Sequence, residues 1–295
     1  MEVGTKRLFC FGLGYSATEL AARLAREGWT VSATATTQTG AERIAALGYE
    51  AYVFDGTHAD PAIPRALETA SHVVLSAPPG PIGDPAFVQF GKALADSQTA
   101  RWIGYLSTIG VYGDWQGGWV DEDSELRPKS ARSLRRAAAE QAWLDLGRET
   151  GKTVLVFRLA GIYGPGRGAI ENVLDGTARR LIKPDQVFNR IHRDDIAGIL
   201  QAAIQHTPKH TIYNVTDDEP APPQDVVAYA AHLLGHPVPP DIAYDPATLS
   251  PMGASFYSEN KRVSNARAKA DLGWQLEYPT YREGLSALAE PIIRD

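Results

Sequence analysis

The sequence predicts an α/β fold, a doubly wound and mostly parallel sheet followed by a small C-terminal lobe. Short apolar runs alternate with amphipathic stretches from the N-terminus to about residue 160. Several of these runs, among them 72–75 and 154–157, are continuously apolar. That pattern is typical of strands covered on both faces in a parallel sheet. The alternation itself favours helices packed on both sides.

Each apolar run predicts one strand of a seven-stranded sheet, at residues 7–11, 30–35, 50–54, 72–76, 102–107, 153–158 and 211–215. Between the first two strands, a helix over 18–27 places Leu20, Ala21 and Leu24 on one face and ends before Gly28. A long helix is expected over 133–148. Asp194 and Asp195 precede an apolar-periodic stretch, so one of them is expected to cap a helix.

The residue composition changes after residue 160. Segment 161–168 is dense in turn-forming residues, and prolines gather at 220–223 and 237–240. We therefore expect residues 1–164 to form the first domain, with 189–215 returning to it. Residues 165–188 and 216–295 are expected to form the smaller, substrate-side lobe.

Composition excludes several classes of function. The chain has 29 Lys and Arg against 35 Asp and Glu, a net charge of −6, and no basic cluster, so neither nucleic acid nor a membrane surface is expected as a partner. The single cysteine, Cys10, forms no internal disulfide and no cysteine zinc site. The seven histidines lack metal-ligand spacing, so no catalytic metal is expected. Without a membrane-length apolar run or a signal-peptide pattern, a cytoplasmic location is expected.

A glycine-rich loop ends the first predicted strand and opens the first helix. It has the G-x-G-x-x-A form of the dinucleotide fingerprint of Rossmann folds, in Gly12-Leu13-Gly14-Tyr15-Ser16-Ala17. Gly12 permits the tight turn, Gly14 lets a pyrophosphate approach the backbone, and Ala17 allows close helix–strand packing. The helix N-terminus supplies N–H groups to the anion. The alternative is a glycine turn without a ligand.

The end of the second strand bears on the choice of cofactor. NAD-selective sites carry an acidic residue there, about 20 residues after the glycines. This window instead ends in Thr36, Thr37 and Gln38, with no carboxylate to repel a 2′-phosphate. NADP is therefore favoured over NAD, although the next basic residue is only Arg43.

Further segments resemble the extended short-chain dehydrogenase/reductases, which include the nucleotide-sugar epimerases. Segments 105–113, 158–167 and 189–195 resemble, in order, the family's active-site strand, its nicotinamide-side loop and a segment re-entering the core. Segments 261–265 and 272–274 are similar to the tail of an atypical branch. The resemblance implies further cofactor contacts after the third, fourth and sixth strands, from Asp55, Gly56, Ser76, Ala77, Pro78, Gly161, Ile162 and Tyr163.

The family's chemistry uses a Ser or Thr, a Tyr and a Lys, and the resemblance places Thr108, with Ser107 beside it, at the first position. Aligning the following helix on Glu140 places Arg132 where Tyr belongs and Arg136 where Lys belongs. Arg136 can still bind a ribose or an anion. Arg132 cannot exchange a proton near neutral pH, because the pKa of arginine exceeds about 12. The alternative is that both arginines lie on the solvent face of the helix.

Another group must then exchange the proton, or the chain does not turn over. Tyr112 is the first candidate, against the alternative of a packed aromatic ring; Tyr163 is expected to line the pocket wall. His192 is either an acid/base group or a structural hydrogen-bonding residue. The acidic run 121–125 is expected to be a solvated loop.

Two functions therefore stay open. The first is an NAD(P)-dependent oxidoreductase or epimerase-like enzyme that acts on a small hydroxylated or nucleotide-linked substrate. The two arginines favour an anionic substrate. The second is a sensor or scaffold that binds the cofactor without turnover. A monomer or homodimer is expected in either case.

Overall fold

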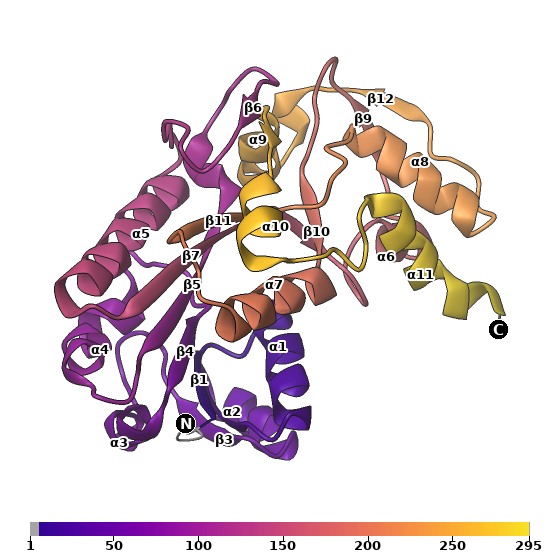
Figure 1. Ribbon diagram of the computed structural model, residues 1–295. Helices are drawn as coiled ribbons and strands as arrows, with labels where there is room; N and C mark the ends of the chain where they lie inside the picture. Colours follow the sequence, from indigo (N-terminus) through magenta and orange to yellow (C-terminus); the bar gives the residue numbers. More distant parts are fainter. Residues whose placement is uncertain (1–5, 295) are drawn as a thin grey trace.

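The computed structural model describes residues 6–294, so Met1–Thr5 of the expected first domain and Asp295 of the second lie outside the described residues. Seven strands form one central sheet in the order β11-β7-β5-β4-β1-β2-β3 (Figure 1). Every neighbouring pair is parallel, which confirms the predicted fold class. The strands are β1 (Arg7–Phe11), β2 (Thr30–Ala35), β3 (Glu50–Val53), β4 (His72–Leu75), β5 (Trp102–Thr108), β7 (Thr153–Leu159) and β11 (Ile212–Val215).

Helices cover both faces of this sheet (Figure 1). One face packs against α1 (Tyr15–Arg26), α2 (Gln38–Ala46) and α7 (Arg193–Gln205). The other packs against α3 (Ile63–Thr69), α4 (Pro85–Asp96) and α5 (Ala131–Thr150). Because side chains alternate along a strand, Cys10 faces the first layer, and Phe9 and Phe11 face the second. None of the helices within residues 6–294 is long and apolar enough to cross a membrane.

The start of α7 differs from the prediction. Neither Asp194 nor Asp195 caps the helix; its N-cap is His192, whose Nδ1 accepts a hydrogen bond from the Asp194 N–H at 3.2 Å. The two aspartates instead occupy the first turn, where a carboxylate favours the helix dipole. The imidazole cap allows the helix to begin immediately after the short strand that ends at His192.

The second lobe has its own core, formed around Tyr163, Val226 and Tyr281. It contains two small parallel ladders and several short helices, seen beside the main sheet in Figure 1. The elements are β8 (Gly161–Tyr163), α6 (Ala169–Leu174), β9 (Arg180–Ile182), β10 (Arg190–His192), α8 (Pro223–Leu233), β12 (Asp241–Ala243), the 3₁₀ turn η2 (Pro246–Thr248), α9 (Pro251–Tyr257) and α11 (Tyr281–Arg294).

The C-terminal segment returns to the main sheet before it enters α11. Helix α10 (Ala266–Leu272) and Trp274 pack into the core around α7. Strand β13 (Arg262–Val263) pairs with β6 (Trp119–Val120), and the Asn260 carbonyl accepts N–H bonds from Trp115 and Gly117. These bonds hold the segment around Asn260 against the loop that follows β5. The division of the chain into two domains at the expected boundaries stays a prediction.

Candidate cofactor and substrate site

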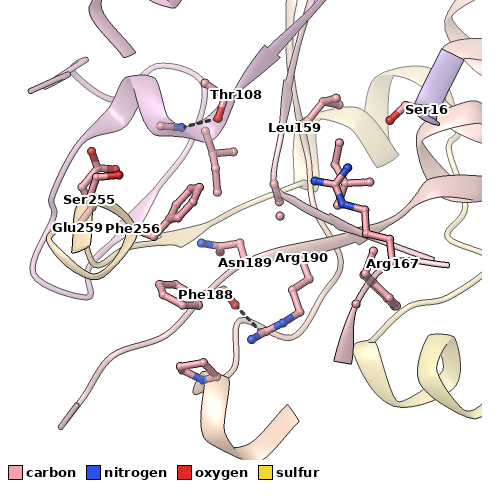
Figure 2. Close-up of a pocket in the computed structure, with 18 of the residues that line it drawn as sticks. Ser16, Thr108, Leu159, Arg167, Phe188, Asn189, Arg190, Ser255, Phe256 and Glu259 are labelled. Carbon is pink, nitrogen blue, oxygen red and sulfur yellow. Dashed lines mark hydrogen bonds between the residues drawn. The ribbon is translucent and has the colours of Figure 1, made fainter. Parts of the chain in front are cut away.

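A cavity of about 780 Å³ lies at the C-terminal ends of the central strands, between the sheet and the second lobe. Figure 2 shows Ser16 and Arg167 on one side of it and Thr108, Ser255, Phe256 and Glu259 on the other. This is the edge at which parallel α/β sheets bind ligands.

The glycine loop has the geometry that a pyrophosphate requires. Gly12 has a φ of +84°, and a Cβ at this position would lie 3.0 Å from the Ser76 hydroxyl. Gly14 is the N-cap of α1 and provides no side-chain cap, so the first N–H groups of the helix are left to a ligand. The residues of this loop that line the cavity are Gly14, Tyr15, Ser16 and Ala17; Gly12 and Leu13 shape the turn behind them. The loop therefore fits the dinucleotide that the fingerprint predicts.

Other expected cofactor residues divide into two groups. Ser76, Arg136, Gly161, Ile162 and Tyr163 line the cavity. The other expected cofactor contacts lie outside its lining: Thr36, Thr37, Gln38, Asp55, Gly56, Ala77 and Pro78. Their roles stay predictions.

Two residues of that outer group have local partners. The Thr37 hydroxyl accepts the Gly40 N–H at 3.1 Å and so caps α2. The Asp55 carboxylate accepts N–H bonds from His58 and Thr57, which lower the pKa of Asp55 to about 2. Asp55 is thus a charged hydrogen-bond acceptor at the surface.

The end of β5 brings Thr108 to the cavity. Its hydroxyl oxygen accepts the Gly110 N–H at 3.1 Å and caps the 3₁₀ turn η1 (Ile109–Tyr112). That bond fixes the hydroxyl and leaves its proton available to a ligand. Ser107 also lines the cavity, but its hydroxyl donates to the Glu140 carboxylate. Of the two, Thr108 is the better placed to orient a substrate oxygen.

The structure corrects the expectation for Tyr112. The turn η1 points this ring away from the cavity into the core, where it is fully buried. Its hydroxyl donates to Asn214 Oδ1 at 2.8 Å and accepts from Arg158 Nη1 at 2.9 Å. Burial raises the pKa of Tyr112 to about 12. Tyr112 therefore packs in the core and cannot reach a substrate in the cavity.

Helix α5 presents both arginines to the cavity. Arg136 is half-buried, and its Nη1 donates to the Leu106 carbonyl at 2.6 Å and to the Tyr105 hydroxyl at 3.2 Å. Arg132 lies nearer the mouth, with its guanidinium 5.0 Å from the ring centre of Phe256. The alternative of two solvent-exposed arginines is therefore wrong for Arg136, whereas Arg132 is exposed and lines the cavity at its edge.

Several cavity residues were not found from the sequence. Lys261 Nζ donates to Glu259 Oε2 at 2.7 Å and to the Gly113 carbonyl at 2.8 Å. Phe256 and Arg190 also line the cavity. All of these except Arg190 lie between 256 and 261, and no sequence pattern placed that segment beside the β5 loop.

Two further expectations concern neighbouring segments. The acidic run 121–125 is not wholly solvated, because Glu122 is buried and accepts the Asn214 N–H at 2.8 Å. Tyr163 lies on the cavity wall as expected, and burial raises its pKa. His192 caps α7 and does not line the cavity. Within residues 6–294, no cluster of three His, Cys, Asp or Glu side chains could hold a metal ion.

Comparison with known proteins identifies the family. The model of the NAD dependent epimerase/dehydratase family matches residues 93–216. Over 294 aligned residues the chain is 30% identical to Protein YeeZ of Escherichia coli (strain K12), covering 93% of this chain and 97% of YeeZ. The chain belongs to the NAD-dependent epimerase/dehydratase family.

Two solved structures extend this assignment. A functionally unknown conserved protein from Silicibacter pomeroyi DSS is 46% identical with a TM-score of 0.89, over 97% of this chain and 99% of that one. UDP-glucuronic acid 4-epimerase from Bacillus cereus, in complex with NAD, has a TM-score of 0.76 at 16% identity, over 98% and 99% of the chains. The second likeness shows the fold of the family alone.

Proposed function

We propose that this family member is an NAD(P)-dependent oxidoreductase or epimerase-like enzyme acting on a small, anionic, hydroxylated or nucleotide-linked substrate. The observation that supports this proposal is that the start of α1, Thr108 and two arginines of α5 all line one cavity. The start of α1 has no side-chain cap. A cofactor and a substrate can therefore meet in one space. When bound, the nicotinamide cofactor supplies hydride transfer.

Different residues of the chain would bind the cofactor and the substrate. Gly12–Ala17 would hold the pyrophosphate, and Arg136 would hold the ribose on the nicotinamide side. Thr108, fixed by its bond to Gly110, would orient a substrate oxygen. The Tyr-Gly turn around 163–164 would close the nicotinamide side of the cavity.

NADP is proposed over NAD. Thr36, Thr37 and Gln38 are exposed at the end of β2 and at the start of α2. No carboxylate occurs among them to repel a 2′-phosphate. The start of α2 also adds N–H groups that favour an anion.

A cofactor-binding sensor or scaffold is the second candidate, and a specific observation favours it. The sequence resemblance places Arg132 and Arg136 where the family has Tyr and Lys, and burial raises the pKa of the cavity tyrosines Tyr15, Tyr163, Tyr257 and Tyr281. A tyrosine with a raised pKa loses its proton less readily. The usual route for proton exchange is thus missing.

Calorimetric titration with NADPH and NADH tests the shared part of both candidates. We expect NADPH to bind at least about tenfold more tightly, a difference of about 1.4 kcal/mol. NADH binding tenfold more tightly contradicts the NADP preference, and failure of both to bind contradicts cofactor binding. Once binding is shown, a substrate screen that follows NADPH absorbance separates the enzyme from the sensor.

A further inference from the structure

The mouth of the cavity contains a guanidinium whose hydrogen-bonding capacity is unused. Arg127 and Arg148 pair with Glu125 and Asp145, and Arg136 donates to the Leu106 carbonyl. No carboxylate among the described residues lies within ion-pair distance of Arg132, although Arg132 lines the cavity. In a chain with a net charge of −6, an arginine left unpaired at a cavity mouth indicates a site for an anion.

Phe256 holds this guanidinium in place. The Arg132 Cζ lies 5.0 Å from the centre of the Phe256 ring, a cation–π contact between α5 and α9. Such a contact occupies the face of the guanidinium and leaves the N–H groups at its edge free. Those N–H groups match a carboxylate, which accepts two parallel hydrogen bonds from one arginine.

The acidic side chain on the same wall of the cavity is itself paired. Glu259 lines the same wall, but Lys261 Nζ lies 2.7 Å from its carboxylate. Arg190 donates from Nη1 to the carbonyls of Phe188 and Ala221, so part of its hydrogen-bonding capacity is used within the protein.

Arg167 also lines the cavity without a carboxylate partner among the described residues, but it lies on the opposite side, 5.5 Å from the Tyr15 ring centre (Figure 2). Arg132, beside Phe256, is the unpaired arginine on the Thr108 side.

The wall around Arg132 is aromatic. Phe256 is 53% exposed although it lines the cavity, so its ring is open to a ligand. Phe188 packs edge-to-face against Tyr257, with ring centres 5.1 Å apart, and both line the cavity (Figure 2 labels Phe188 and Phe256). Aromatic walls of this kind favour flat unsaturated rings.

The anion site and Thr108 lie on the same side of the cavity. Figure 2 shows Thr108 and Phe256 on one side of it, and the Arg132 guanidinium lies against Phe256. A substrate whose acidic group binds Arg132 can therefore turn its reacting oxygen toward Thr108.

We propose that the substrate is a small aromatic carboxylic acid whose carboxylate binds Arg132 and whose ring lies on Phe256 and Phe188. This inference rests on the proposed function, because it places the acid beside the proposed cofactor. It assigns Arg132 to the substrate and Arg136 to the cofactor. The nucleotide-linked alternative is tested directly by the UDP-glucuronate probe.

The test uses the full chain and three probes in calorimetry, with and without saturating NADPH. The probes are cinnamate, its neutral amide cinnamamide, and UDP-glucuronate. We expect cinnamate to bind at least about tenfold more tightly than cinnamamide. Arg132→Gln should weaken cinnamate binding about 10- to 100-fold and leave NADPH binding unchanged. Phe256→Leu should weaken it about 2- to 10-fold.

Arg148→Gln is the matched control, because Arg148 lies on the same helix but outside the cavity, and circular dichroism checks that each variant is folded. Equal binding of cinnamate and cinnamamide, an Arg132→Gln variant that binds cinnamate as the parent does, or loss of NADPH binding in that variant overturns the proposal. So does binding of UDP-glucuronate without cinnamate, or binding of no probe. If NADPH and NADH fail to bind but cinnamate binds through Arg132, the proposed function falls and the acid site stands.

Discussion

The Arg158 guanidinium and the Glu140 carboxylate form a buried ion pair beneath the floor of the cavity. Arg158 Nη2 lies 2.8 Å from Glu140 Oε2, and each side chain is only 3% exposed. Ser107 donates to the same carboxylate, and Arg158 also donates to Tyr112. The pair therefore joins α5 and β7 to the end of β5 and the turn that follows Thr108.

Glu140→Leu should lower the free energy of unfolding by about 3–5 kcal/mol, because it leaves the Arg158 charge buried without a partner. Denaturant unfolding measures the loss. The double variant Glu140→Leu with Arg158→Leu should recover much of that stability, because no buried charge remains. A double variant that is as unstable as the sum of both single variants contradicts this account.

The architecture of the main sheet could be predicted because its determinants are local. Continuously apolar runs mark the buried parallel strands, and all seven runs fall within one residue of the observed strand at both ends, among them Arg7–Phe11. The glycine loop could also be predicted, because the turn requires a positive φ at a single position and glycine occupies it at Gly12.

The substrate side could not be predicted, because it depends on long-range pairing. Lys261 reaches the Gly113 carbonyl only because Asn260 and β13 bring the C-terminal segment to the β5 loop. Tyr112 was expected in the cavity because it follows Thr108 closely, but the direction of its ring is set by Asn214, 102 residues away. Sequence spacing predicts neither the position of Lys261 nor the direction of the Tyr112 ring.

Gly12→Ala should abolish cofactor binding and lower the free energy of unfolding by about 1–2 kcal/mol. The new Cβ would force a positive φ on an L-residue and would lie 3.0 Å from the Ser76 hydroxyl. Gly28→Ala is the matched control, since Gly28 has a φ of +82° but no atom within 4 Å of the added Cβ. That variant should show a similar backbone cost with unchanged NADPH affinity. Full NADPH affinity in Gly12→Ala would show that the loop does not hold the pyrophosphate.

The contribution of His192 to the stability of the protein should fall as the pH drops from about 6.5 to about 4. Burial lowers the pKa of His192 from 6.5 to about 4, and its Nδ1 must be unprotonated to accept the Asp194 N–H. In that window the unfolded chain binds a proton that the folded chain does not. Stability contributed by the neutral imidazole is therefore present above pH 6.5 and lost as the pH falls toward 4.

His192→Asn isolates this contribution, because asparagine keeps a side-chain acceptor at the N-cap and does not titrate. The buried Asp195, whose pKa is raised to about 7 by burial, has the opposite pH dependence but is present in both proteins. Over the window, the parent should lose about 2–3 kcal/mol more than the variant in chemical unfolding. Parallel stability curves would show that His192 does not titrate in the folded state.

Arg136→Ala should weaken NADPH binding by about 1–3 kcal/mol, the range of a charge-assisted hydrogen bond. Its bonds to Leu106 and Tyr105 hold the guanidinium on the cavity wall, where we propose that it takes the role of the family's Lys. Arg148→Ala, on the solvent-exposed end of the same helix, serves as the control. Calorimetry at matched pH measures both, and an unchanged dissociation constant for Arg136→Ala excludes a role in cofactor binding.

Restoring the family's pair with Arg132→Tyr and Arg136→Lys separates the enzyme from the sensor. A tyrosine at 132 provides a hydroxyl that exchanges a proton, and a lysine at 136 lowers its pKa through positive charge. If the parent is a sensor, only this double variant should oxidise NADPH in a carbonyl-substrate screen, and each single variant should stay silent. If the parent is an enzyme, it should turn over its own substrate, and the double variant should lose that activity together with the anion contact at Arg132. Turnover by the parent that the double variant retains unchanged would show that neither arginine takes part in the reaction.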